Sequence, residues 1–281
     1  MRTVKYPGVL TARTPIHHGG PEVYGTIKPI LTLPTLIEDE KGMRVEDVPY
    51  IHGNAIRGYL RRLVMQDFLD QLDYDLKSAK IYHFLFTGGL LEANTKSSGM
   101  IDVKLKSGIR KYIPPASLWG SALGNQMIQG KLKVDLAEPI CKELYWQQKQ
   151  YCDIDGPSSY SLKARDFGTR LDSLREYKED REDGEQATQM KYEFEVIVKG
   201  AKFYHEFTLT DTDPVEESCF IRALNLWSER PYLGGKSGSG YGKLDIRYDY
   251  DPDAEATYLS YVEEKADLIR EFLDELQANW R

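Results

Sequence analysis

The residues with the clearest chemical potential lie in a glycine-rich segment, YLGGKSGSGYGK, at positions 232–243. Glycine has no side chain, so its amide N–H can lie directly against an anion such as a phosphate. Positive charge, hydroxyl groups and an aromatic ring accompany the five glycines, supplied by Lys236, Ser237, Ser239, Tyr241 and Lys243. This combination predicts a loop that binds a polyanion.

Two familiar nucleotide-binding loops do not match this segment. The triphosphate-binding pattern GxxxxGK[ST] needs a glycine five residues before Gly235, but that position is Arg230. A dinucleotide-binding loop opens a helix, whereas the residues after Gly242 alternate as in a strand. The pattern therefore favours a phosphate polymer over a mononucleotide. A flexible glycine hairpin with no ligand is the alternative.

A second segment, VPYIHGNAIRGYLRRL at 48–63, predicts a short strand, a tight turn at 52–54 and a helix from about 55 to 72. Apolar residues recur every four positions and predict its buried stripe: Ile56, Leu60, Val64, Phe68 and Leu72. Arg57 and Arg61 share a different face.

The start of this helix has an unusual charge. Helix N-termini favour acidic residues, yet the first turns of this helix hold Arg57, Arg61 and Arg62, and its first acid is Asp67. An anion bound by the amides of residues 54–56 together with arginine would remove the mismatch. Solvated arginines at a small energetic cost are the alternative.

Composition places the chain among globular proteins. It has 281 residues, 41% of them hydrophobic, and no apolar run long enough to cross a bilayer. No apolar signal core follows the N-terminus, and the three cysteines are scattered without a zinc-binding spacing, so we expect a cytoplasmic protein.

The net charge of −7 is unevenly distributed along the chain. Eleven acids and four bases follow position 244, whereas residues 96–111 carry five bases and one acid. A basic groove beside an acidic flank is therefore compatible with the negative total. Ordinary surface charge without a groove remains open.

The order of elements predicts an α+β fold with a ferredoxin-like core. Strands are expected over 2–14, 191–198 and 202–209, and a helix from 215 to about 228. We expect palm halves at 1–86 and 192–250, an inserted helical region at 87–160, a thumb-like charged arm at 161–191, and an acidic amphipathic helix at 251–281.

Four segments together resemble the RAMP superfamily, specifically the backbone subunit that lines the guide RNA in class 1 CRISPR effector complexes. They are residues 14–20, 50–62, 189–203 and 232–243, and they occur in the family's order. The resemblance implies a modified RRM-like palm with large insertions, a projecting charged thumb and a C-terminal helix. It further implies a subunit that polymerises along the guide RNA, protects it and presents it for target pairing.

The same resemblance implies which residues contact RNA and which partners the chain has. The expected RNA contacts are Arg13, His17, His18, Asn54, Arg57, Arg61, Lys236, Ser237, Ser239, Tyr241 and Lys243, with Arg165, Arg170 and Arg175 on the thumb. The partners would be CRISPR RNA, target nucleic acid, other copies of the chain and other effector subunits. We expect no metal, cofactor or membrane.

One departure from the family bears on catalysis. Type III backbone subunits cut target RNA with an aspartate shortly after the His-Gly segment, and Lys28 stands at that position here. An amine cannot replace a carboxylate in metal binding or base chemistry, so we expect a non-catalytic subunit. The block at 112–134 resembles type IV subunits more than type III. The alternatives are a type III-like endonuclease that uses Glu22 or Asp39, and a protein-interaction domain outside CRISPR.

Overall fold

The computed structural model describes residues 2–21, 27–39, 42–91, 101–149, 156–170 and 190–280. Its helices are α1 (Gly53–Gln71), α2 (Ala79–Phe86), α3 (Val103–Tyr112), α4 (Pro114–Trp119), α5 (Tyr145–Gln148), α6 (Pro214–Glu229), α7 (Ala256–Glu264) and α8 (Ala266–Asn279). Its strands are β1 (Thr3–Ala12), β2 (Ile27–Lys28), β3 (Thr32–Asp39), β4 (Gly42–Pro49), β5 (Gly89–Leu91), β6 (Ser121–Gly124), β7 (Gln126–Ile128), β8 (Leu132–Val134), β9 (Glu138–Pro139), β10 (Lys163–Arg170), β11 (Met190–Ile197), β12 (Lys202–Thr210) and β13 (Leu244–Tyr248).

The central sheet has the strand order β13-β1-β12-β8, and β9 also pairs with β12. All of these pairs are antiparallel. Helix α1 lies between β1 and β8 in the chain, and α6 lies between β12 and β13. This is the split β-α-β arrangement of ferredoxin-like domains, which confirms the expected α+β class. β8 and β9 fall within the segment 87–160 that was expected to be an inserted helical region.

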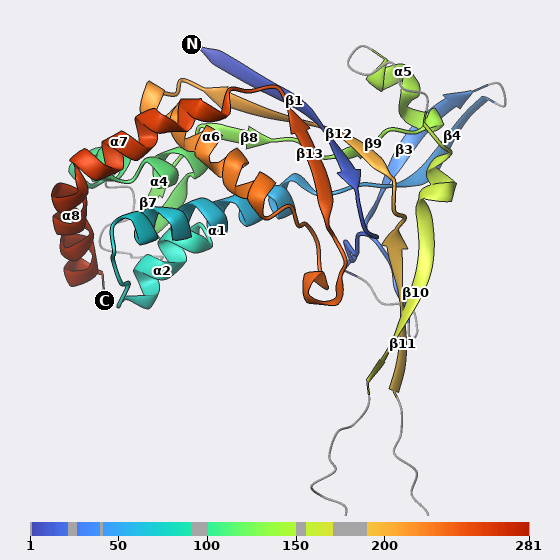
Figure 1. The fold of residues 1–281 in the computed structure, drawn as a ribbon, viewed down its shortest axis with the longest axis horizontal. Coiled ribbons are helices and arrows are strands. Elements are labelled where there is room, and N and C mark those ends of the chain that lie inside the picture. The colour runs from blue at the N-terminus through green and yellow to red at the C-terminus, as the bar shows by residue number, and fades with distance from the viewer. Residues whose placement is uncertain are drawn as a thin grey trace, which may run out of the picture.

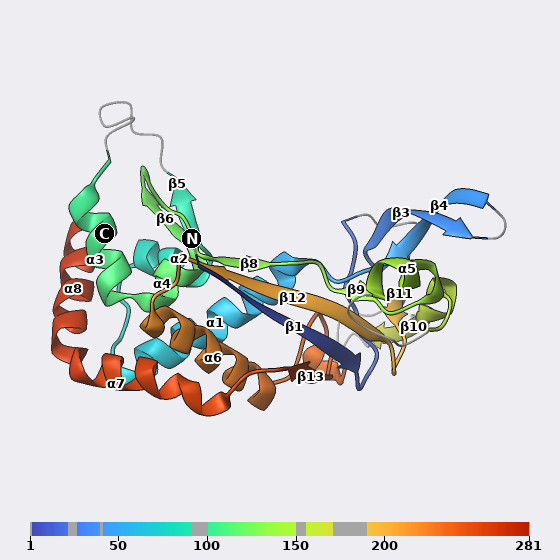
Figure 2. The same cartoon turned by 90° about the horizontal axis from the view of Figure 1, so that it is seen from above.

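Buried and partly exposed side chains alternate along β12, so one face of the sheet is buried. Phe203, His205, Phe207 and Leu209 are buried, whereas the residues between them are partly exposed. The buried face carries helices α1 and α6, which lie on the same side of the sheet (Figure 1, Figure 2). The Phe207 ring packs against Phe220 of α6 with centroids 5.1 Å apart.

Helix α1 follows the predicted pattern closely. The side chain of His52 caps its N-terminus, and all five residues of the expected apolar stripe are buried. The helix begins two residues earlier than predicted, at Gly53, which lies against the end of β8, where a side chain would have no room. A Cβ on Gly53 would lie 2.5 Å from the carbonyl oxygens of Val134 and Asp135.

Two β-hairpins project from this body. β10 and β11 form an antiparallel ribbon that extends away from the central sheet, and β2 joins the base of β11 in parallel (Figure 1). β3 and β4 form a second hairpin at the end of the molecule opposite α8 (Figure 1, Figure 2).

The C-terminal segment is two helices rather than the single amphipathic helix expected from 251 to 281. α7 ends at Lys265, which has non-helical ψ near 10° and directly precedes α8. The turn lets Tyr258 and Val262 of α7, and Ile269 and Leu276 of α8, all reach buried positions. None of the helices in the described part of the chain has the length and apolar character of a membrane span.

Two glycines of α1 give a test of how the helix is positioned. Gly53→Ala should lower the free energy of unfolding by about 1–3 kcal/mol, because the new methyl group meets the β8 main chain. Gly58→Ala is the matched control. Its nearest contact is the flexible end of Arg62 at 3.5 Å, so helix propensity should leave stability unchanged or raise it by about 0.5–1 kcal/mol. Equal losses in chemical denaturation would contradict this placement.

Candidate nucleic-acid interface

A hollow of about 310 Å³ lies where three separate parts of the chain meet. The segment that carries His17 and His18 forms one wall, the first turns of α1 form another, and the start of the glycine loop forms a third. Lys28 and Arg62 also line it. Its described lining residues include two permanent cations and no carboxylate, so the hollow suits an anion.

The helical periodicity of α1 determines which of its residues face this hollow. Asn54, Gly58 and Arg62 line it, and they follow one another at intervals of four residues. Arg57 and Arg61 lie one position earlier on the helix, so their side chains point elsewhere. Sequence reasoning chose the wrong pair of arginines for this face.

The structure instead places Arg57 and Arg61 against the main chain of Trp119. Both guanidinium groups donate to the Trp119 carbonyl oxygen, Arg61 over 3.1 Å, and Arg57 also donates to Leu132 over 3.2 Å. Arg61 is buried, and burial together with the nearby Arg57 charge lowers the pKa of Arg61 to about 10. Neither arginine lines the hollow with the glycine loop.

The amides at the start of α1 are also largely occupied. The N–H of Asn54 donates to Nδ1 of His52 over 3.0 Å, and the N–H of Ala55 donates to the His52 carbonyl. The expectation that the amides of residues 54–56 are free for an anion therefore fails for these two. The helix dipole and the exposed Asn54 side chain remain available.

Three histidines hold this corner together through their hydrogen bonds. Nε2 of His18 accepts from the His52 N–H over 3.1 Å, and Nδ1 of His17 lies 2.9 Å from the Glu195 carbonyl oxygen. Because a carbonyl only accepts, Nδ1 of His17 carries a proton. Burial, and then the neighbouring His52 and His17, lower the pKa of His18 to about 4. Burial also lowers the pKa of His17.

The glycine loop needs its glycines at two close contacts. Gly234 has φ +86° and Gly242 has φ +79°, values that side-chain-bearing residues rarely adopt. A Cβ at these positions would lie 2.8 Å from the His17 carbonyl oxygen and 2.1 Å from that of Leu233, respectively. The N–H groups of Gly235 and Gly242 bind the carbonyls of His17 and Pro15, each over 2.8 Å. The loop is therefore tied to the histidine segment.

The tip of the loop keeps free amides. Within the described residues, no acceptor binds the consecutive N–H groups of Lys236, Ser237 and Gly238. Ser237 and Ser239 are exposed, and Lys236 has the left-handed conformation with φ 63°. Successive free amides of this kind form anion-binding concavities.

Lys236 and Tyr241 attach the loop to the base of the β10–β11 ribbon. Nζ of Lys236 lies 4.1 Å from the ring centroid of Phe194 and 4.4 Å from that of Tyr192. The Tyr241 hydroxyl donates to Asp166 over 2.6 Å, and this bond raises the pKa of Tyr241 to about 12. Both side chains therefore fix the position of the loop.

The remaining predicted RNA contacts either do not line the hollow or lie outside the described residues. Arg13 and Lys243 are exposed and adjacent, since the Arg13 N–H donates to the Lys243 carbonyl over 2.8 Å. Arg165 is exposed on β10. The side chain of Arg170 and all of Arg175 lie outside the described residues, as do Glu22 and the side chain of Asp39.

Two lining cations were missed by sequence reasoning. Lys28 was considered only as the replacement for an acid, and Arg62 only as part of an arginine cluster. The four-residue interval from Asn54 was the available signal for Arg62. Lys28 is placed by the pairing of β2 with β11, which no local pattern reveals.

The fold agrees with the comparisons with known proteins. The sequence model of the RAMP superfamily matches residues 9–245, and the chain belongs to that superfamily. Among solved structures, it is similar to a chain of a structure titled "Type IV-B CRISPR Complex", with TM-score 0.62 and 17% identity over 88% of this chain and 90% of that one. The comparison with curated proteins gave no match.

The neutral state of His18 gives a pH prediction. The folded chain keeps His18 unprotonated down to about pH 4, whereas an ordinary histidine takes a proton near 6.5. Protonation in the unfolded state therefore favours unfolding as the pH falls through this interval.

His18→Gln keeps a hydrogen-bond acceptor but cannot titrate. Between about pH 7 and about pH 5 it should lose about 1–2 kcal/mol less stability than the wild-type chain. His205, whose pKa burial lowers to about 3, is common to both proteins and cancels in the difference. Denaturant titrations at the two pH values measure the effect, and parallel losses would show that His18 is not held neutral.

Proposed function

We propose that this chain is a non-catalytic backbone subunit of a type IV-like CRISPR ribonucleoprotein. Copies of it would polymerise along the guide RNA, protect it and present it for pairing with a target nucleic acid. The partners would be the guide, the target and other subunits of the effector complex. The observation that carries the proposal is the hollow in which Lys28, Arg62 and the start of the glycine loop converge, with no carboxylate among the described lining residues.

The chemistry of this hollow suits a ribose-phosphate strand. Lys28 and Arg62 supply two cations, and the loop tip adds three successive free amides at residues 236–238. None of these groups reads a base, so binding would be independent of sequence. Membership of the RAMP superfamily and the likeness to a CRISPR complex support RNA as the polyanion.

A non-catalytic role is favoured by the residue at the position of the family's aspartate. Lys28 lies in the hollow itself, where an amine favours phosphate binding over metal or base chemistry. Its neighbours His17 and His18 are shifted towards their neutral forms. Incubation of the assembled complex with complementary RNA and Mg²⁺ should give no regularly spaced cuts. A ladder of cuts would overturn this part of the proposal.

Charge reversal at the two lining cations tests the RNA site. Lys28→Glu and Arg62→Glu should each weaken binding of single-stranded RNA roughly tenfold, and the slope of log affinity against log salt should become less steep by about 0.7 per lost contact. Fluorescence anisotropy over a salt series measures both quantities. Lys77→Glu, an exposed charge reversal beside α8, is the matched control and should bind as the wild type does.

Arg61 separates this site from the one expected from sequence. Arg61→Met keeps the bulk of a buried side chain whose guanidinium donates to Trp119. RNA affinity of the folded variant should stay within about twofold of the wild type, because Arg61 does not line the hollow. A loss as large as that of Arg62→Glu would return the phosphate site to the Arg57–Arg61 face.

The identity of the RNA is tested by purification. The chain, expressed with its CRISPR array, should carry RNA through a low-salt purification, and sequencing should return spacers flanked by repeat-derived ends. Protein free of nucleic acid under these conditions would favour an interaction domain outside CRISPR.

A further inference from the structure

The outer face of the β3–β4 hairpin is apolar and has no described partner. Leu36 and Val45 lie opposite each other in the register, and Met43 is two positions further along on the same face. These side chains are 52%, 65% and 65% exposed. Ile37 and Val48 on the inner face are buried, at 1% and 2%. The hairpin therefore needs only its inner face for packing on its own body, and large exposed apolar patches commonly mark interaction sites.

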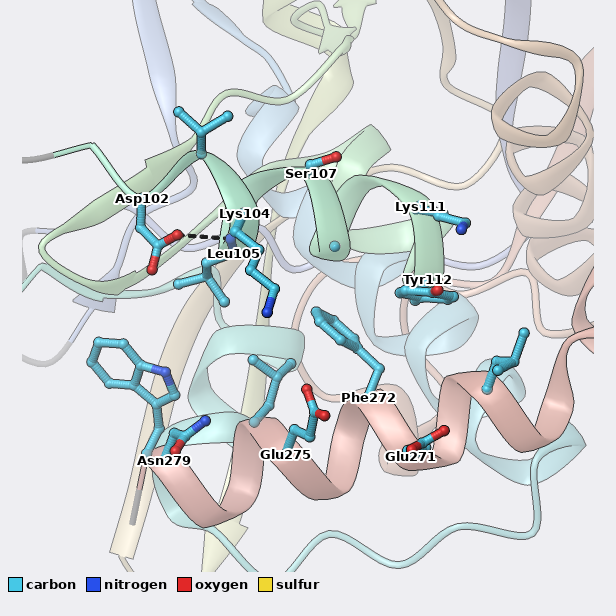
Figure 3. Close-up of a pocket in the computed structure, with 15 residues that line it drawn as sticks. Asp102, Lys104, Leu105, Ser107, Lys111, Tyr112, Glu271, Phe272, Glu275 and Asn279 are labelled. Atoms are coloured by element: carbon cyan, nitrogen blue, oxygen red, sulfur yellow. Dashed lines mark hydrogen bonds between the residues drawn. The ribbon is translucent and has the colours of Figure 1, made fainter.

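An apolar groove lies at the opposite end of the molecule, between α3 and α8 (Figure 3). Its volume is about 1020 Å³. Phe272 of α8 forms the floor of the groove. Its ring packs against Gly108, where an added Cβ would lie 2.6 Å from the ring, and against Tyr112, with ring centroids 5.1 Å apart. Val103 and Leu268 border the opening and are 71% and 46% exposed.

The two surfaces differ in charge in a way that suits their contact. Residues 38–47 of the hairpin contain five acids and two bases, whereas α3, at 103–112, contains four bases and no acid. Lys104 and Lys111 line the groove on the α3 side. Glu271 and Glu275 on α8 form the opposite wall, so an acidic hairpin fits best against α3.

We propose that the β3–β4 hairpin of one copy docks in the α3–α8 groove of the next copy. This inference rests on the polymerisation part of the proposed function and names its contact surfaces. The hairpin is a narrow projection and the groove is open, so their shapes correspond. The two strands lie about 5 Å apart, and the ten-residue α3 is about 15 Å long, which is room for one hairpin.

The position of the two surfaces determines the kind of assembly. They lie at opposite ends of the molecule in both views of the fold (Figure 1, Figure 2). An end-to-end contact between two copies therefore leaves one hairpin and one groove free. A contact of this type is heterologous and extends into an open chain unless the rotation closes a ring.

Two exposed residues allow each surface to be disabled without touching the core. Val45→Lys adds a base to the hairpin face, opposite the lysines of α3, and Val103→Glu adds an acid to the groove, opposite the acidic hairpin. In sedimentation velocity of RNA-free protein, the wild type should form oligomers that grow with concentration. Each single variant should associate at least tenfold more weakly than the wild type. Met127→Glu changes a residue of similar exposure, 59%, on β7 outside the groove, and should behave as the wild type does.

A mixture of the two variants gives the sharper result. Val103→Glu keeps an intact hairpin and Val45→Lys keeps an intact groove, so the mixture should form a heterodimer that grows no further. A wild-type chain that stays monomeric without RNA at its highest soluble concentration would overturn the proposal. So would variants that associate normally, or a mixture with no heterodimer.

Binding of short RNA by the same proteins is measured separately. Both variants should bind one short RNA per chain with wild-type affinity, because neither residue lines the RNA hollow. A wild-type chain that oligomerises but binds no RNA would refute the proposed function and leave the docking surfaces intact. A chain that binds RNA but does not associate without it would refute the docking surfaces and leave the RNA-binding part of the proposed function intact.

Discussion

The arrangement of the site depends on main-chain hydrogen bonds made by residues 14–17. Ile16 exchanges two hydrogen bonds with Ile197 of β11, over 2.9 and 2.8 Å, while Pro15 and His17 accept from Gly242 and Gly235 of the glycine loop. One short segment thus joins the base of the projecting ribbon to the loop. Because the groups involved are peptide groups, side-chain substitutions affect this junction mainly where they add bulk, as at Gly234 and Gly242. Of the two cations of the hollow, Lys28 lies on β2, which pairs with β11 beside this junction, and Arg62 comes from α1.

The neighbouring residues Arg61 and Arg62 of α1 have different roles. Arg61 is 6% exposed and bound to a carbonyl, whereas Arg62 is exposed and lines the hollow. Successive residues on a helix point about 100° apart, so neighbours in sequence serve different surfaces. The buried guanidinium of Arg61 donates to the Trp119 carbonyl and so connects α1 to the end of α4. The exposed guanidinium of Arg62 is available to bind an anion.

Much of the fold was predictable because it follows local patterns. The apolar stripe of α1, the alternation of β12 and the glycine loop each occupy the positions that the sequence indicates. Most of the errors concern groups whose role is set by partners far away in the sequence. The Trp119 carbonyl binds Arg57 and Arg61, and the pairing of β2 with β11 brings Lys28 into the hollow. One error is local, because the His52 side chain accepts from the Asn54 amide that was expected to be free. The break at Lys265 was missed because the apolar period continues across it.

The central strand β1 pairs with strands that are synthesised much later than β1 itself. It precedes both of its neighbours, β12 and β13, by a long stretch of chain. Its residues must wait for partners roughly 200 or more positions later, and such long-range pairing slows folding. Leu244 pairs with Ala12 next to the glycine loop, so the hollow can close only after Leu244 has left the ribosome. Partly made chains would therefore be unable to engage a ligand there.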